Sequence, residues 1–277
     1  MTRLIVTADD FGLAEPVNEA VERAHRDGIL TAASLMVGAD AAADAVDRAR
    51  RLPKLGVGLH VVLVDGRPLL PPEQVPALVG TDGWFRRDLV AAGINFFFHP
   101  AARRQLAAEI RAQFEAFRQT RLRLDHVNAH CHIHLHPTVL GLILRIGQTY
   151  GVRAVRLPCE PSGGGALAPW LWLLRTRLRR AGVICNDVVL GLRDTGAMTE
   201  ERVLALLAEL KGMPPDTVVE LYFHPATRRC PEINRSMPSY QHEAELAALL
   251  SPHVRSALKT QGIILSRFDA LTASVMT

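Results

Sequence analysis

Five of the eleven histidines in this chain lie in one short run, between Asp125 and Pro137. Within the run, His130, His132 and His134 alternate with less polar residues. If the run is a strand, its side chains point alternately to opposite faces, so the three imidazoles share one face. Imidazole is a common metal ligand. The pattern therefore predicts a metal site or polar cavity on one side of the strand and a core on the other.

The composition narrows the class of protein. At 277 residues the chain is long enough to bury a full core, as one large α/β domain or two small ones. Its hydrophobic content of 48% is on the apolar side, and its net charge of +4 includes no long basic block. No nucleic-acid-binding motif accompanies the basic residues. A basic and rather apolar chain fits an anionic membrane surface better than a nucleic acid.

The four cysteines contain no Cys-x-x-Cys pair, which argues against a zinc ribbon and a dense disulfide framework. The N-terminal residues read directly as a strand and leave no room for a signal peptide. No run of about 18 uncharged apolar residues predicts a membrane-spanning helix. We therefore expect a cytoplasmic protein, with peripheral contact to the inner membrane surface as a further expectation.

Predicted strands and helices alternate along the chain. Besides the histidine run, short apolar segments predict strands at 4–8, 33–37, 57–63, 152–158, 188–190, 218–223 and 263–265. Helical periodicity and capping signals predict helices at 15–27, 41–51, 103–120, 137–150, 199–211 and 242–250.

This alternation, with acids and histidines at predicted strand ends, predicts one α/β domain over residues 1–277. We expect an irregular (β/α) barrel of mostly parallel strands with its site at the C-terminal rim. Residues of about 65–100 and 160–187 read as insertions, and the first is expected to be irregular because it is rich in Gly and Pro. An open doubly wound sheet is the alternative, although no Gly-x-Gly-x-x-Gly follows the first strand.

Asp9 and Asp10 follow the first predicted strand. On an extended segment adjacent side chains diverge, so the two acids are expected to have different tasks. One could bind a metal while the other accepts a proton from a metal-bound water. One Asp and two His with an open position make a workable hydrolytic metal site. His60, with one or more histidines of the run, completes the predicted ligand set.

Each of these signals has a plain structural explanation when it is taken alone. An acid pair after a strand can cap a helix, His60 can be a hydrogen-bonded core residue, and His224 before Pro225 can mark a turn. All of them occur together, each at a predicted strand end. This joint pattern favours a metal site.

Five motifs follow one another along the chain: Thr7-Ala8-Asp9-Asp10-Phe11-Gly12, Gly58-Leu59-His60, the alternating histidines ending in His136-Pro137, Arg156-Leu157-Pro158 and Leu221-Tyr222-Phe223-His224-Pro225. In these motifs the chain resembles the YdjC-like (ChbG-like) carbohydrate deacetylase family, and among its members the deacetylases associated with hopanoid biosynthesis (HpnK type). The narrower likeness rests on residues 125–128 and 96–98.

The resemblance implies an irregular (β/α) barrel that removes acetyl from an N-acetylated amino sugar with a divalent metal. Zn²⁺ is expected, with Mg²⁺, Mn²⁺ and Co²⁺ as alternatives. By resemblance, Asp10, His60 and His130 are the metal ligands. By the same resemblance, Asp9 is the general base, Arg156 holds Asp9 ionised and oriented, and His224 is the general acid.

The chain departs from the family pattern at Asn128 and Cys131, where related members often have a further acid or histidine. His130 and His132 therefore both stand as candidates for the third ligand. His132, His134 and Glu160 are also candidates for substrate binding or for orienting a ligand.

Residues 168–180 begin with Trp and Leu and continue with four arginines. Such a segment suits an interfacial helix whose arginines meet lipid phosphates. An ordinary barrel helix or a homodimer contact is the alternative. With the resemblance, this segment and the Phe96–Phe98 patch predict an amphiphilic glycolipid substrate.

The predicted reaction is N-deacetylation of an N-acetylglucosaminyl hopanoid (bacteriohopanetetrol type) to the glucosaminyl form and acetate, in hopanoid biosynthesis. The first alternative is deacetylation of a soluble chitooligosaccharide. The second is a non-catalytic metal- or sugar-binding protein. A phosphoesterase usually needs two metals about 4 Å apart, and the sequence offers few ligands for a second one.

Overall fold

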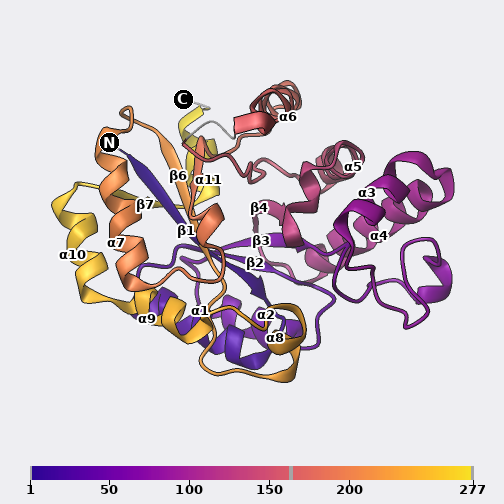
Figure 1. Cartoon of the computed structure of the whole chain (residues 1–277), viewed down its shortest axis with the longest axis horizontal. Coiled ribbons are helices and arrows are strands. Elements are labelled where there is room, and N and C mark those ends of the chain that lie inside the picture. The colour runs from indigo at the N-terminus through magenta and orange to yellow at the C-terminus, as the bar shows by residue number, and fades with distance from the viewer. Residues whose placement is uncertain (1, 162–164, 276–277) are drawn as a thin grey trace.

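The computed structural model describes residues 2–161 and 165–275. Over these residues the chain forms a seven-stranded parallel sheet in the order β4-β3-β2-β1-β6-β5, with β7 beside β1 (Figure 1). Its strands are β1 (Arg3–Phe11), β2 (Ala32–Leu35), β3 (Gly56–Val61), β4 (Leu124–Ala129), β5 (Val188–Leu190), β6 (Val218–Phe223) and β7 (Ile264–Ser266). The predicted mostly parallel α/β architecture is confirmed.

Strand β1 lies at the centre of the sheet. Every residue from Leu4 to Phe11 is buried, as expected for a parallel strand that is covered on both faces. β6 pairs along one edge of β1, while β7 pairs with the beginning of the other edge and β2 with its end. The C-terminal end of β1, which carries the acid pair, therefore lies between β2 and β6.

The sheet curls back on itself through residues 154–159. Val155 forms an isolated parallel bridge with Val127 of β4, and Ala154 forms one with Ile184. Beyond them, the Val189 N–H of β5 donates to the Cys159 carbonyl at 2.7 Å. Residues 152–158 are thus not the regular strand that the sequence predicts. They connect β4 to β5 through isolated bridges and single backbone hydrogen bonds.

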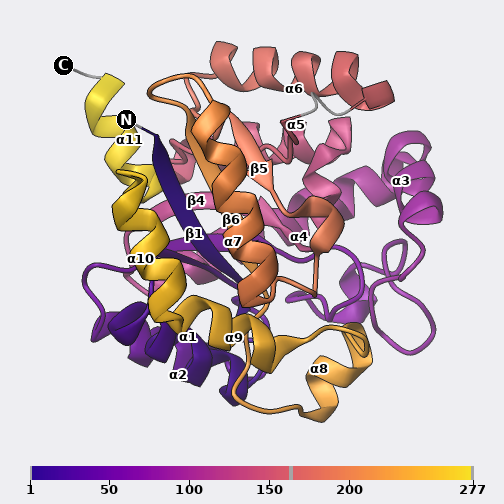
Figure 2. The same cartoon turned by 60° about the vertical axis from the view of Figure 1, so that its left-hand side comes forward.

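Helices cover the outside of the sheet (Figure 2). They are α1 (Glu15–Asp27), α2 (Ala42–Arg50), α3 (Leu89–Phe98), α4 (Pro100–Gln119), α5 (Pro137–Gly147), α6 (Ala168–Arg180), α7 (Glu200–Glu209), α8 (Pro231–Ser236), α9 (His242–Leu250), α10 (Pro252–Thr260) and α11 (Phe268–Val275). Among the described helices, none is long and apolar enough to cross a membrane.

The first predicted insertion is more regular than expected. It contains a short 3₁₀ helix, η1 (Pro72–Gln74), and α3, so the prediction of an irregular segment is wrong for 89–98. The Asp88 carboxylate caps α3 by accepting from the backbone N–H groups of Val90 and Ala91. In the second insertion, α6 occupies residues 168–180, and residues 162–164 lie outside the described residues.

Candidate metal centre

The histidine run does not form a strand beyond Ala129. β4 ends there, and residues 130–135 form the 3₁₀ helix η2 (His130–Leu135). Cys131 and His132 both have a φ of 52°, in the left-handed region, so the chain turns directly after His130. The predicted alternation of three histidines on one strand face is therefore wrong. The turn separates His130 from the two later histidines.

The extended backbone that the sequence predicts for the acid pair is interrupted at Asp10, and the two acids contact different partners. Asp10 has a φ of 60°, and the register between β1 and β2 shifts between Ala8 and Phe11. Aspartate adopts left-handed φ more readily than most residues, and a bulge re-aims the side chains around it. Both carboxylates consequently reach neighbouring positions at the C-terminal end of β1.

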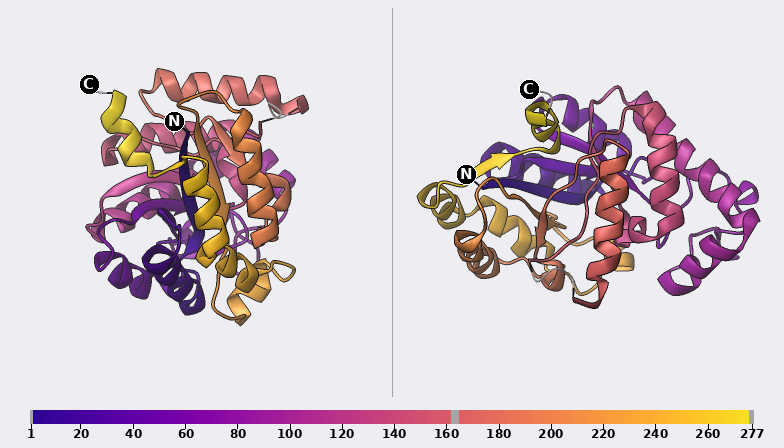
Figure 3. Two further views of the ribbon diagram at one scale, coloured as in Figure 1. Left: turned by 90° about the vertical axis from the view of Figure 1, so that its left-hand side faces the viewer. Right: turned by 90° about the horizontal axis from the view of Figure 1, so that it is seen from above.

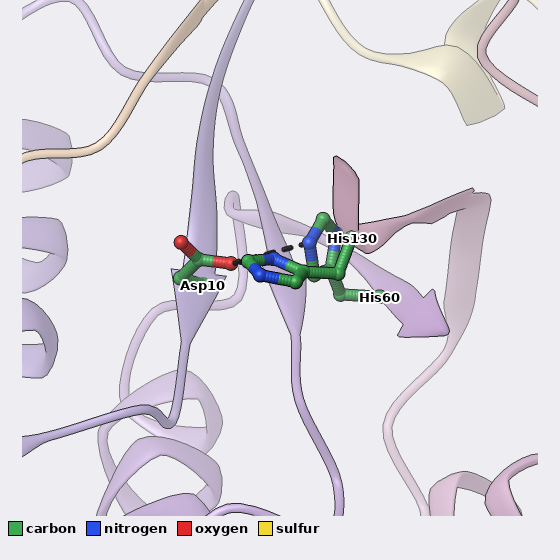
Figure 4. Close-up of side chains that lie close together, drawn as sticks. All are labelled: Asp10, His60 and His130. Atoms are coloured by element: carbon green, nitrogen blue, oxygen red, sulfur yellow. Dashed lines mark hydrogen bonds and ion pairs between the residues drawn. The ribbon is translucent and has the colours of Figure 1, made fainter. Parts of the chain in front are cut away.

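Asp10, His60 and His130 meet at this end of the sheet (Figure 4). The Asp10 Oδ1 atom lies 3.2 Å from His60 Nε2 and 3.1 Å from His130 Nδ1. One ligand atom from each residue lies within 4.8 Å of the others, and all three side chains are buried. The second carboxylate oxygen of Asp10 is buried with no hydrogen-bond partner among the described residues.

Asn128 determines which nitrogen of His60 faces Asp10. The Asn128 side-chain amide donates to Asp9 Oδ1 and to Ser34 Oγ, both at 2.9 Å. Its oxygen is left as the acceptor for His60 Nδ1, 2.7 Å away. With Nδ1 carrying the hydrogen, the lone pair of neutral His60 Nε2 points at a carboxylate oxygen. Two facing acceptors need a cation or an added proton between them, and a metal ligand histidine typically has such a partner on its other nitrogen.

A buried guanidinium holds the second acid. Arg156 is fully buried and forms a bidentate pair with Asp9 through Nη1 and Nη2. On its other side, Nε donates to Glu220 Oε2 at 2.9 Å and Nη2 to Glu220 Oε1 at 2.7 Å. Burial alone would raise the pKa of Asp9, but Arg156 outweighs it and holds that pKa well below its usual range.

The charges of the cluster are unbalanced without a cation. The cluster holds three buried carboxylates, those of Asp9, Asp10 and Glu220, and the single guanidinium of Arg156, which pairs with Asp9 and Glu220. Burial would lower the pKa of His130, but Asp10 outweighs it and holds that pKa well above its usual value. One imidazolium and one guanidinium then face three carboxylates, and the remaining negative charge is buried, which is costly. One carboxylate, two imidazoles and an unpartnered oxygen therefore fit a divalent metal ion in both charge and ligand type.

The chain matches the profile of YdjC-like proteins over residues 3–260. The chain belongs to the YdjC-like family. A carbohydrate deacetylase from Brevibacillus brevis is 30% identical over 269 residues, which are 97% of this chain and 99% of that protein. A human carbohydrate deacetylase is 32% identical over 97% of this chain and 91% of its own. The crystal structure of a protein from Enterococcus faecalis V583 has a TM-score of 0.80 and 25% identity, covering 98% of each chain.

In this YdjC-like protein, the remaining candidate residues, His132, His134 and Glu160, are not part of the group formed by Asp10, His60 and His130. His134 Nε2 donates to the Arg156 carbonyl at 3.0 Å, and burial lowers the pKa of His134 to about 3. The His132 ring packs edge-on against Tyr222, with 5.4 Å between ring centroids. Glu160 pairs with Arg193 at 3.2 Å. Of the two candidates for the third ligand, the structure brings His130 to Asp10.

His224 follows β6 on the other side of β1 from His60. Its backbone N–H donates to Glu245 Oε2 at 2.5 Å, and its carbonyl accepts from His242 Nδ1 at 2.6 Å. These bonds fix the chain where β6 ends. Its ring packs edge-on against Tyr222 and Tyr240, and desolvation lowers the pKa of His224 to about 4. The imidazole is therefore neutral at pH 7.

Sequence reasoning missed three residues that support the site: Ser34, Asn128 as a partner of His60, and Glu220. Glu220 is an acid within the apolar strand Val218–Phe223, and a lone acid in such a run is a signal of a buried ion pair. Asn128 stands beside His60 in the register of β3 and β4. That pairing is visible only once the strands are aligned.

A cavity of about 240 Å³ opens beside His130. Its wall combines apolar residues such as Leu13 and Met36 with Asp65, Arg235 and the indole of Trp84. Two guanidinium groups lie over the Trp84 indole, with that of Arg235 centred 3.5 Å and that of Arg67 4.7 Å from a ring centroid. A cavity with aromatic, apolar and charged groups beside a metal-sized site has the composition of a ligand pocket.

Proposed function

We propose that the chain is a divalent-metal-dependent deacetylase of an N-acetylglucosaminyl hopanoid. Relatives that align over nearly the whole chain are named carbohydrate deacetylases, which are hydrolases that act on a linear amide, and the chain is an enzyme of this kind. The observation that carries the mechanism is the position of Asp9, held by Arg156 and Asn128 directly beside the three candidate ligands.

Asp10, His60 and His130 would hold the metal. A divalent ion there would polarise the acetamide carbonyl as a Lewis acid and lower the pKa of an attacking water. Zn²⁺ suits this ligand set, with Mg²⁺, Mn²⁺ and Co²⁺ as alternatives. Asn128 keeps His60 in the tautomer that presents Nε2 to the site.

Asp9 would accept the proton of the attacking water. Its low pKa keeps it ionised over the physiological range, and Arg156 fixes its orientation. His224 would protonate the departing nitrogen. Because its pKa is about 4 in the free protein, it must first gain a proton during the reaction. That proton can come from Asp9, which accepts it from the attacking water and binds it only weakly because its pKa is low.

An amphiphilic substrate is supported by the surface near the site. The cavity beside His130, at about 240 Å³, is smaller than the roughly 300–1,000 Å³ of pockets that enclose drug-sized ligands. It suits one sugar unit and leaves a polycyclic tail outside. Of the described exposed large hydrophobic residues, most belong to α3, to the start of α6 or to the residue directly before α6: Leu89, Val90, Ile94, Phe97, Phe98, Leu167, Trp172 and Leu173.

Acetate release from an N-acetylglucosaminyl hopanoid and from diacetylchitobiose tests the proposal, with metal-reconstituted protein and Asp9→Asn as the inactive control. We expect release from the hopanoid and at least about tenfold less from the soluble sugar. Release from diacetylchitobiose alone would keep the chemistry and replace the substrate by a soluble chitooligosaccharide. Release from neither, with metal bound, would favour a binding protein and contradict the proposal.

His130→Ala and His132→Ala separate the two candidates for the third ligand. We expect His130→Ala to weaken Zn²⁺ binding by more than about 100-fold, because a direct ligand is lost, and His132→Ala to change it less than about threefold. Isothermal titration of the metal-free proteins measures both. The reverse order of the two affinities would move the ligand role to His132.

A further inference from the structure

Four arginines from three helices surround one pocket outside the metal centre. Arg103 and Arg104 belong to α4, Arg145 to α5 and Arg177 to α6, and no acidic residue lines the pocket. In two views α3 and α4 lie together at one end of the molecule, with α5 and α6 beside them (Figure 1, Figure 3). The pocket is therefore assembled by tertiary packing rather than by a basic run in the sequence.

The four guanidinium charges are uncompensated. Among the described residues none of the four forms an ion pair with a carboxylate. Arg177 donates to the Pro137 carbonyl at 2.9 Å and Arg103 to the Phe96 carbonyl at 3.3 Å, contacts that orient both groups without neutralising them. Several converging arginines with no acid nearby favour an anion, because a guanidinium matches phosphate geometry.

Exposed apolar residues border this pocket on both sides. On one side, the Arg103 guanidinium lies 5.6 Å from the Phe97 ring centroid of α3. On that helix Val90, Ile94 and Phe98 are exposed at four-residue spacing, with 73%, 53% and 68% of their surface accessible. On the other side, exposed Leu173 is one turn before Arg177 on α6.

Arg175 and Arg177 of α6 turn in different directions. Arg175 turns to Asp187, 3.3 Å away. Arg177 turns instead to α5, where Gly141 leaves room for it: a Cβ there would lie 2.3 Å from Arg177 Nη2. Trp170, at the start of α6, is also tied inward, because its Nε1–H donates to the Leu135 carbonyl at 3.1 Å.

We propose that this arginine pocket binds the phosphate of an anionic phospholipid while α3 and the start of α6 insert their exposed apolar side chains into the same leaflet. An apolar stripe beside fixed cations is the arrangement of an interfacial membrane contact. A free anion would not explain the apolar border, and a nucleic acid would not explain an exposed aliphatic helix face. The contact would bring the cavity beside His130 to the surface on which an amphiphilic substrate resides, and it does not depend on amide cleavage.

Vesicle flotation of the full-length, metal-loaded protein tests the site. We expect binding to phosphatidylcholine vesicles that contain phosphatidylglycerol and much weaker binding to phosphatidylcholine alone. Arg104→Gln with Arg145→Gln, two exposed side chains, should lower the partition coefficient about 25-fold at low ionic strength, since each arginine near such a surface contributes a factor of about five. Ile94→Gln with Phe98→Gln should lower it as well. High salt should weaken binding of the unchanged protein.

Lys211→Gln with Lys259→Gln is the matched control, because it removes two exposed charges from η6 (Leu210–Gly212) and α10, on the other side of the molecule (Figure 1). It should change the partition coefficient less than about threefold. Asp9→Asn should bind vesicles like the unchanged protein, so that docking and deacetylation are judged separately.

Three outcomes would overturn the proposal. The first is no difference between anionic and neutral vesicles, or equal effects of the arginine and lysine pairs. The second is displacement by inorganic phosphate at constant ionic strength, which would assign the pocket to the free anion. The third is a dimer that Ile94→Gln with Phe98→Gln dissociates, without vesicle binding, which would assign the surface to a second copy of the chain.

Discussion

Replacing Asp9 by asparagine is expected to lower kcat for acetate release by on the order of 10³-fold. An amide cannot accept the proton of the attacking water, although it has nearly the same shape as the carboxylate. Asp9 is not one of the three candidate ligands, and Arg156 keeps Glu220 as a partner, so the fold and the metal content should persist. Acetate assays and elemental analysis of the purified variant measure the two quantities.

Glu220→Gln is the control for this change, because Glu220 contacts the other side of the same guanidinium. It loosens Arg156 but leaves the Asp9 carboxylate in place, so we expect a loss of only about tenfold. Asp9→Asn protein with a rate within tenfold of the unchanged enzyme would show that another group takes the proton. A large loss of bound metal would instead make Asp9 a ligand.

Replacing Arg156 by methionine is expected to reduce the free energy of unfolding by about 3–5 kcal/mol, because the buried carboxylates of Asp9 and Glu220 lose their shared cation. Urea unfolding in the presence of a chelator measures this without a contribution from metal binding. Arg111→Met, on the exposed side of α4, should change the same free energy by less than about 0.5 kcal/mol.

The effect of Arg156→Met should grow with pH. In the unchanged protein the pKa of Asp9 lies below its unfolded value, so its contribution to stability is complete above about pH 5 and is lost as the pH falls through the lower range. Without the guanidinium, burial raises the pKa of Asp9, so the folded variant binds a proton and loses stability as the pH rises. A difference that stays constant between pH 5 and pH 8 would contradict this account.

The local pattern of the chain is sufficient for most of its elements. Helices at 15–27 and 242–250 and the strand at 218–223 begin and end where the sequence predicts, because in each the run of apolar residues is bounded by polar residues. The first helix also has a proline, Pro16, in its first turn. The same pattern places Asp10, His60 and His130 at strand ends. Since the ends of parallel strands meet at one edge of a sheet, the predicted strands bring Asp10, His60 and the histidine run to the same edge, but they leave the choice between His130 and His132 open.

Tertiary structure decided what local patterns could not. Strand spacing predicts three equivalent histidines, but the turn at Cys131 and His132 leaves His130 at Asp10 and sends His134 to the carbonyl of Arg156. The sequence predicts an extended backbone at the acid pair, but Asp10 is left-handed and faces His60 and His130, while Asp9 pairs with Arg156. Residue types and strand ends are local properties, so the sequence by itself determined which groups this protein can use. Asn128 beside His60, Glu220 on Arg156 and the four arginines around one pocket join residues far apart in the chain, and only packing brings such groups together.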